Sequence, residues 1–340
     1  MTISARPPFF SVLINTYNYG CYIEEAIDSV LSQTFPQEQI EIIVVDDGST
    51  DDTANRVKKY GDRISYIYKT NGGQASAFNA GVEAANGEII AFLDSDDYWA
   101  PSKLQEVAVE FGRSSLVDFV YHYMDVVDSD RRLLDRYVYP EPVKENYLKT
   151  YLSGNLPWFS STSGMAIKKG CLKKMMPLPE DFSIAADMYL HYLLPFYMQG
   201  LSLVKKFLGY YRLHGGNLSG GSLLTAAKLQ REQKIILFNI EHVRRHAGNA
   251  GLDSQLLIKR MESMVKVYGI YILSVQGHKL SALKEVLHFK DFLPADTMLQ
   301  RLGRIMTLLI ATVMSPANNL RLQRTYRKIW SVVSHTTCIP

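Results

Sequence analysis

Cysteine is scarce in this chain of 340 residues. Its three copies, Cys21, Cys171 and Cys338, lie far apart and form no Cys-x-x-Cys pair. This spacing argues against a disulfide framework and against a cysteine-based metal cluster, and it favours a reducing compartment.

Long apolar runs are also missing. No stretch reaches the roughly 18 consecutive apolar residues that a membrane-spanning helix needs. The first residues, MTISARPPFFSVLI, have one arginine but no long apolar core after it, so we expect no secretory signal. A Gly-x-Gly-x-x-Gly segment after the first apolar run is absent too, which disfavours a dinucleotide-dependent oxidoreductase.

The net charge of +3 hides an uneven distribution. Residues 1–224 carry 20 Lys and Arg against 27 Asp and Glu, a net charge of −7, whereas residues 225–340 carry 17 against 7, a net charge of +10. An acidic first part suits cations as partners, and a basic last part suits an anionic surface.

Apolar runs alternate with helical patterns over the first hundred residues. We predict strands at 9–16, 40–45, 64–68 and 88–93, and helices at 22–33, 53–60 and 74–85. This alternation predicts an α/β fold with a mostly parallel, Rossmann-like sheet flanked by helices. Ligands of such sheets bind at the carboxyl ends of the strands.

The pattern changes twice further along the chain. We predict a helix from Pro101 to Phe111, strands at 117–127, 160–169 and 201–213, and a helix at 183–198. From residue 224 the pattern is almost entirely helical, with helices at 224–246, 253–274 and 280–293. We therefore predict an α/β domain at 1–222 and a helical C-terminal extension at 223–340.

Two acidic clusters follow predicted strands. Asp94, Asp96 and Asp97 end the strand at 88–93, and their mutual repulsion suggests a bound Mg²⁺ or Mn²⁺, although a solvated acidic turn would have the same composition. Asp46 and Asp47 end the strand at 40–45. They suit hydrogen bonds from a nucleobase or ribose, or a turn in which Thr50 or Asp51 caps the next helix.

Four segments taken together resemble family 2 of the glycosyltransferases, which has the GT-A fold. They are NTYN (15–18), VVDDGSTDDT (44–53), NGGQASAFNAG (71–81) and the acidic triplet, and the resemblance covers about residues 9–220. It implies an inverting transferase that moves a sugar from a UDP- or dTDP-sugar to a saccharide or lipid-linked acceptor hydroxyl with Mn²⁺ or Mg²⁺. It also implies a role in cell-surface polysaccharide or glycolipid synthesis.

The same resemblance implies a role for particular residues. The donor-binding positions are Thr16, Tyr17, Asp47, Asn79, Asp94 and Ser95. The metal ligands are Asp96 and, in the glycine-rich segment after the last predicted strand, His214. Phe78 stands where the family often has a basic residue that holds the donor.

An inverting transfer needs a base that takes the proton of the acceptor hydroxyl. The resemblance implies that Asp187 is this base, although Ala186 replaces the glutamate that often precedes it. A carboxylate near a helix start is otherwise a simple partner of the helix dipole. Trp158 and Gly164 match the acceptor-binding strand, where Trp158 would stack on a sugar and Gly164 would leave room.

The last residues have a separate character. Residues 297–340 hold six Lys and Arg and no acid, next to a broad apolar helical pattern. Two interpretations remain open: an interfacial helix on an anionic membrane, or a helical part packed on the α/β domain or on a second copy of the chain. No nucleic-acid-binding motif accompanies the basic residues.

These features predict a cytoplasmic protein, either free or bound to the inner face of the membrane. Phe78 and the missing glutamate also allow an alternative function, a nucleotide- or carbohydrate-binding protein that has lost catalysis.

Overall fold

The computed structural model describes residues 8–142, 146–156, 159–180, 186–215, 217 and 225–288. The chain divides into two compact units. The sheet unit comprises Met1–Tyr147 and Pro157–Gly216, and the helical unit comprises Leu148–Leu156 and Asn217–Pro340. The predictions for Trp158 and for residues 297–340 fall outside the described residues.

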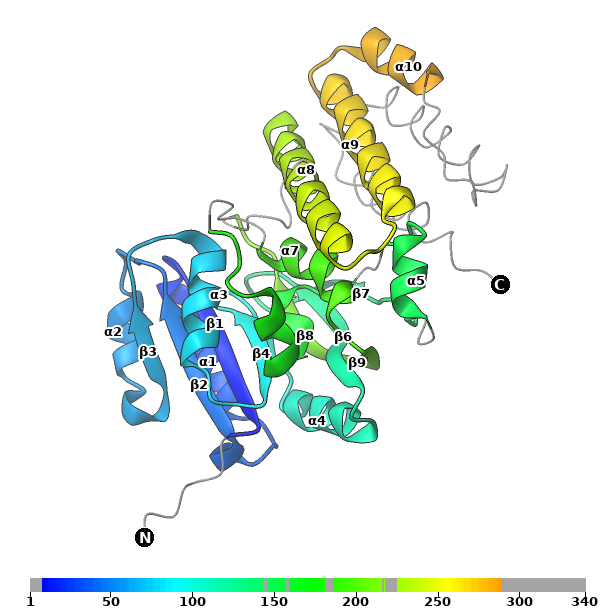
Figure 1. The fold of residues 1–340 in the computed structure, drawn as a ribbon. Coiled ribbons are helices and arrows are strands. Elements are labelled where there is room, and N and C mark those ends of the chain that lie inside the picture. The colour runs from blue at the N-terminus through cyan, green and yellow to red at the C-terminus, as the bar shows by residue number, and fades with distance from the viewer. Residues whose placement is uncertain are drawn as a thin grey trace. The chain divides into compact units, whose positions relative to one another are not determined.

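The first half of the sheet unit has the predicted alternation. The strands β1 (Phe10–Thr16), β2 (Ile40–Asp46), β3 (Ser65–Tyr68) and β4 (Ile89–Asp94) pair in parallel, with β1 between β2 and β4. Figure 1 shows them side by side in blue and cyan. The predicted α/β fold with a Rossmann-like, mostly parallel sheet flanked by helices is confirmed, and all pairings among these four strands are parallel. The apolar runs of β1, β2 and β4 are mostly buried, as is typical of parallel strands.

The second half of the sheet is mixed. It contains β5 (Tyr98–Trp99), β6 (Val117–Val127), β7 (Leu133–Tyr137), β8 (Met165–Lys168) and β9 (Gly200–Arg212). In the described part of the chain these strands continue the sheet in the order β3-β2-β1-β4-β8-β6-β9-β5, with β7 paired to β6. The strand β8 is antiparallel to both β4 and β6, whereas β6 and β9 are parallel.

Helices cover both faces of the sheet. On one face, apolar side chains of α1 (Gly20–Leu31), α2 (Thr53–Lys58) and α4 (Lys103–Arg113) share a buried cluster with alternate residues of β1, such as Val12 and Ile14. In this cluster α1 packs on β1, α2 packs on α1, and α4 packs on β6 and β9. On the other face, α3 (Gly73–Ala84) packs on β1 and β2 and also contacts α7 (Ala186–Leu193). Gly81 of α3 lies so close to Leu13 and Val45 that an added Cβ would be within 3.2 Å of either side chain.

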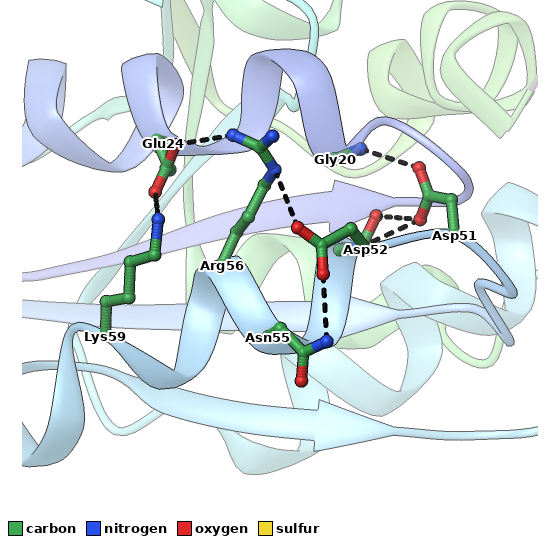
Figure 2. A network of polar contacts seen from close by, with 8 residues as sticks. Gly20, Glu24, Asp51, Asp52, Asn55, Arg56 and Lys59 are labelled. Atoms are coloured by element: carbon green, nitrogen blue, oxygen red, sulfur yellow. Dashed lines mark hydrogen bonds and ion pairs between the residues drawn. The ribbon is translucent and has the colours of Figure 1, made fainter.

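A polar network joins α1 to α2 on the surface of the sheet unit. Figure 2 shows the carboxylate of Glu24 on α1 accepting from Arg56 at 2.8 Å and from Lys59 at 2.5 Å. The carboxylate of Asp51 accepts from the Gly20 amide at 2.9 Å and from the first amide of α2 at 3.0 Å. Of the two predicted capping residues, Asp51 therefore serves the start of α2, and the same side chain also holds the start of α1.

The helical unit contains α8 (Ala226–Asn249), α9 (Gln255–Val275) and α10 (Lys279–Leu287), together with most of the short helix α5 (Tyr147–Leu152). Its apolar cluster joins α8 to α9 and α10 through Leu229, Ile270, Tyr271 and Val286. The predicted helical C-terminal region is thereby confirmed. Within the described residues, none of the helices is both long and apolar enough to cross a membrane.

Candidate functional site

Both acidic clusters lie at the same edge of the sheet. Thr16, the last residue of β1, is opposite Asp46 on β2, and Asn15 is opposite Asp94 on β4. The hydroxyl oxygen of Thr16 is buried and has no hydrogen-bond partner among the described residues. The parallel arrangement thus brings together carboxylates that are nearly 50 positions apart in the sequence.

Asp47 is 4% exposed and its carboxylate is used by the loop before α3. One oxygen accepts from the Lys69 ammonium at 2.7 Å and from the Gly72 amide at 3.0 Å, and the other accepts from the Gly73 amide at 2.6 Å. Asp47 therefore stabilises the N-terminal end of α3 in the structure, and its predicted contact with a nucleobase stays a prediction. Lys69 is a basic residue at this edge that the motif comparison missed.

The loop from Asp94 to Asp97, hereafter the acidic loop, concentrates negative charge. Burial, together with the charges of Asp96 and Asp187, raises the pKa of Asp94 to about 7. Burial and the charges of Asp96 and Asp94 also raise the pKa of Asp97 well above its ordinary value. Ser95 is buried, and its hydroxyl has no partner among the described residues. A cation at this loop would remove the repulsion.

Asp96 and His214 lie together, as the predicted metal site requires. The Nε2 atom of His214 is 3.0 Å from an oxygen of Asp96. Among the described residues, no group of three or more His, Cys, Asp and Glu side chains is arranged to hold a metal ion. One carboxylate and one imidazole nevertheless suit Mn²⁺, whose remaining ligands would be phosphate and water oxygens.

Two aromatic side chains that the motifs did not single out lie beside His214. The ring of Tyr19 is 5.5 Å from the imidazole and the ring of Tyr22 is 5.0 Å from it, measured between centroids. Burial and the charges of Asp96 and Asp94 raise the pKa of Tyr19. Tyr17 is 47% exposed at the end of β1, and its stacking on a base stays a prediction.

Arg212 is 2% exposed and links several elements around the acidic loop. Its guanidinium pairs with Glu25 of α1 and donates to the backbone oxygen of Asp96 at 2.8 Å. The rings of Tyr22 and Tyr98 lie 4.9 Å and 5.1 Å from it. The strand β9 also contains Lys205 and Lys206, so no signal in the sequence singled out Arg212.

Asp187 lies in the first turn of α7 and is half-buried. Its carboxylate accepts from the Met188 amide of the same helix at 2.8 Å, and its charge contributes to the raised pKa of Asp94. One turn later on the same helix, burial lowers the pKa of His191, and the charge of Asp187 opposes this shift. The role of Asp187 as the base stays a prediction.

Asn79 and Phe78 serve the packing of α3. The Asn79 amide donates to the backbone oxygen of Leu178 and to Glu180, each at 2.9 Å, and accepts from the Leu178 amide at 2.7 Å. Phe78 is buried against Phe92 with 4.9 Å between ring centroids. The amide of Asn79 is thus occupied by the segment before α7, and its predicted donor contact stays a prediction.

Gly164 is buried in a tight contact and does not line open space. A Cβ added to it would lie 1.7 Å from the Ser160 hydroxyl oxygen. The expected room for an acceptor is therefore taken by Ser160. The close approach of the Ser160 side chain is the physical reason for glycine at this position.

The fold and the carboxylate-lined edge define a glycosyltransferase of the GT-A type. Residues 11–175 match the sequence model described as Glycosyl transferase family 2. An uncharacterized glycosyltransferase of Nostoc sp. is 38% identical over 231 residues, which cover 66% of this chain and 69% of that protein. The chain belongs to glycosyltransferase family 2.

Other curated relatives match over shorter parts. The glycosyltransferase EpsH of Bacillus subtilis is 30% identical over 217 residues, 61% of each protein. An uncharacterized glycosyltransferase of Rickettsia prowazekii is 46% identical over 98 residues, 29% of this chain and 30% of that protein. The chain therefore spans less than two thirds of the length of these two relatives.

Solved structures share the fold at low sequence identity. The S. aureus TarS 1–349 complex with UDP has a TM-score of 0.55 at 21% identity and covers 95% of this chain and 90% of that one. The Pyrobaculum calidifontis mannosyltransferase PcManGT, in complex with GDP-Man and Mn²⁺, has a TM-score of 0.58 at 18% identity and covers 98% and 89%. At these identities the likeness shows the fold alone.

Proposed function

We propose that this protein is an inverting glycosyltransferase that uses Mn²⁺ or Mg²⁺ and moves a sugar from a UDP- or dTDP-sugar to an acceptor hydroxyl. One observation carries the proposal: in a chain of glycosyltransferase family 2, the Asp96 carboxylate lies 3.0 Å from the His214 imidazole in the loop that follows β4. This pair suits a cation that would bind the diphosphate of a donor, and we assign the role of base to Asp187 on α7.

The reaction needs one proton transfer and one displacement. The Asp187 carboxylate accepts the proton of the acceptor hydroxyl, and the acceptor oxygen forms a bond to the anomeric carbon. The bond from that carbon to the diphosphate oxygen breaks on the opposite side, so the nucleoside diphosphate leaves and the anomeric configuration inverts. A cation held by Asp96 and His214 would offset the charge that develops on the leaving diphosphate.

Several features of the sheet edge support a nucleotide-sugar donor. Thr16 and the exposed ring of Tyr17 lie at the position that we propose for the nucleobase of the donor. Lys69 supplies positive charge beside α3. TarS structures hold UDP or UDP-GlcNAc, and the PcManGT structure holds GDP-Man with Mn²⁺. We extend this donor class to the present chain, with a saccharide or lipid-linked acceptor of cell-surface synthesis.

The test compares the wild-type chain with Asp187→Asn. Donor hydrolysis and transfer to a panel of sugar acceptors are measured with UDP-sugars and Mn²⁺, and UDP affinity is measured by calorimetry. Loss of a general base should lower the turnover about 10²–10⁴-fold while UDP affinity stays within about twofold. Asp62→Asn, an exposed carboxylate remote from α7, is the matched control and should behave as wild type.

Two results would count against the proposal. Unchanged turnover in Asp187→Asn would remove this residue as the base. Wild-type binding of UDP with Mn²⁺ but no turnover of any donor would instead favour the alternative, a nucleotide-binding protein without catalysis.

A further inference from the structure

Ser163 is a fully buried serine in the short turn Thr162–Gly164 that precedes β8. Its hydroxyl donates to a carboxylate oxygen of Asp97 at 2.6 Å and accepts from the backbone amide of Asp94 at 3.1 Å. One side chain therefore joins the first and the last residue of the acidic loop. It does so from a position more than 60 residues further along the chain.

The backbone of Ser163 is itself held in place. Its carbonyl oxygen accepts from the Trp99 indole at 2.8 Å and from the Lys103 ammonium nitrogen at 3.0 Å. Lys103 is fully buried and lies 3.1 Å from the centroid of the Trp99 ring. The next residue, Gly164, packs tightly on Ser160. Ser163 is thus anchored on sides that do not depend on the acidic loop.

The hydroxyl of Ser163 matters because the loop it holds is electrostatically crowded. Asp97 is buried beside Asp94 and Asp96, and its carboxylate accepts from the Ser163 hydroxyl and from the Arg212 amide at 2.9 Å. These two donors hold the Asp97 side chain in the interior of the sheet unit. The side chain of the preceding residue, Asp96, lies beside His214 at the candidate cation site.

We propose that Ser163 is a positioning residue, which keeps the acidic loop in the shape that lets Asp96 bind the cation of the donor complex. This inference rests on the proposed function. Ser163 acts through the Asp94 amide and the Asp97 carboxylate.

The experiment compares Ser163→Ala and Ser163→Cys with wild type. The cysteine variant keeps a side chain of similar size but a much weaker donor, so it covers the case in which alanine prevents folding. Ser29→Ala is the matched control, because Ser29 is also buried in the sheet unit and its hydroxyl donates only to a carbonyl of its own helix, at 2.7 Å. Unfolding temperatures without metal, UDP affinity with and without Mn²⁺, and steady-state constants are measured for each.

We expect both Ser163 variants to raise the Mn²⁺ concentration for half-maximal UDP binding about tenfold, and the donor KM by a similar factor. The kcat at saturating donor should stay within about threefold of the wild-type value. Asp97→Asn should give the same pattern, and the double variant should be no worse than Asp97→Asn alone. A lower unfolding temperature with unchanged Mn²⁺ dependence, or additive effects in the double variant, would overturn the inference.

The calorimetric readout separates this inference from the proposed function. A wild-type chain that shows no turnover would refute the enzymatic proposal. The role of Ser163 could still be tested in that case, because Mn²⁺-dependent UDP binding is measured without turnover. An active wild type with Ser163 variants indistinguishable from Ser29→Ala would refute only the role of Ser163.

Discussion

Replacing Asp94 with asparagine should stabilise the protein without metal and weaken its binding of the donor nucleotide. The pKa of Asp94 rises from an ordinary value of 3.8 to about 7, because the group is buried and faces Asp96 and Asp187. A shift of this size corresponds to about 4 kcal/mol between the two protonation states. Asp94 is only half-buried by surface area, so screening by solvent reduces the expected gain to about 2 kcal/mol.

The sign of the pH dependence follows from the direction of the shift. Since the pKa is higher in the folded chain than in the unfolded chain, the free energy of unfolding of the wild type falls as pH rises from about 4 to about 7. Asp94→Asn removes this loss. The stabilisation should therefore be small at pH 4 and complete above pH 7.

Thermal unfolding in a metal chelator is the assay. A gain of about 2 kcal/mol raises the unfolding temperature of a unit of this size by about 4–8 °C at pH 8. Asp130→Asn, whose parent side chain is 70% exposed, is the control and should show no such pH-dependent gain. Calorimetry with UDP and Mn²⁺ should at the same time show weaker binding by Asp94→Asn.

The reasoning would be refuted by equal unfolding temperatures of wild type and Asp94→Asn at pH 8. An equal gain at pH 4 and pH 8 would also refute it, because the effect would then be unrelated to the ionisation of Asp94. Such results would mean that the carboxylates of the acidic loop do not repel one another in the folded chain.

Three further changes test the packing and the hydrogen bonds of the sheet unit. Gly164→Ala places a Cβ 1.7 Å from the Ser160 hydroxyl oxygen and should destabilise the fold by about 1–3 kcal/mol in denaturant titrations. Gly112→Ala is the control, because an added Cβ at this helix position would have nothing within 4 Å, and it should be neutral or stabilising by up to about 1 kcal/mol. A Gly164→Ala variant more stable than Gly112→Ala would contradict the packing. Asp51→Ala removes the acceptor for the first amides of α1 and α2 and should lower the free energy of unfolding by about 1–2 kcal/mol (Figure 2). An unchanged denaturant midpoint would show that water replaces the carboxylate.

Local patterns were enough to predict most of the secondary structure of the described residues. The strands β1, β2 and β4 are buried apolar runs, of which β2 and β4 end at acidic residues, and α1 has a clear apolar face. The short elements β5, β7, α5 and α6 (Lys169–Leu172) were missed. The strand β5 has two residues, and four of the five residues of β7 are exposed, so neither has a readable periodicity.

The order of the elements, the family motifs and the position of each acidic cluster at a strand end could be predicted, because these features depend on residues close together in the chain. Which side chains meet depends on the tertiary fold. The hydroxyl of Ser163 reaches Asp97, Arg212 reaches the Asp96 backbone, and Asn79 holds the segment at Leu178. Each of these contacts joins residues 66 to 116 positions apart. Strand order and register create such contacts, and no local pattern of residues encodes them.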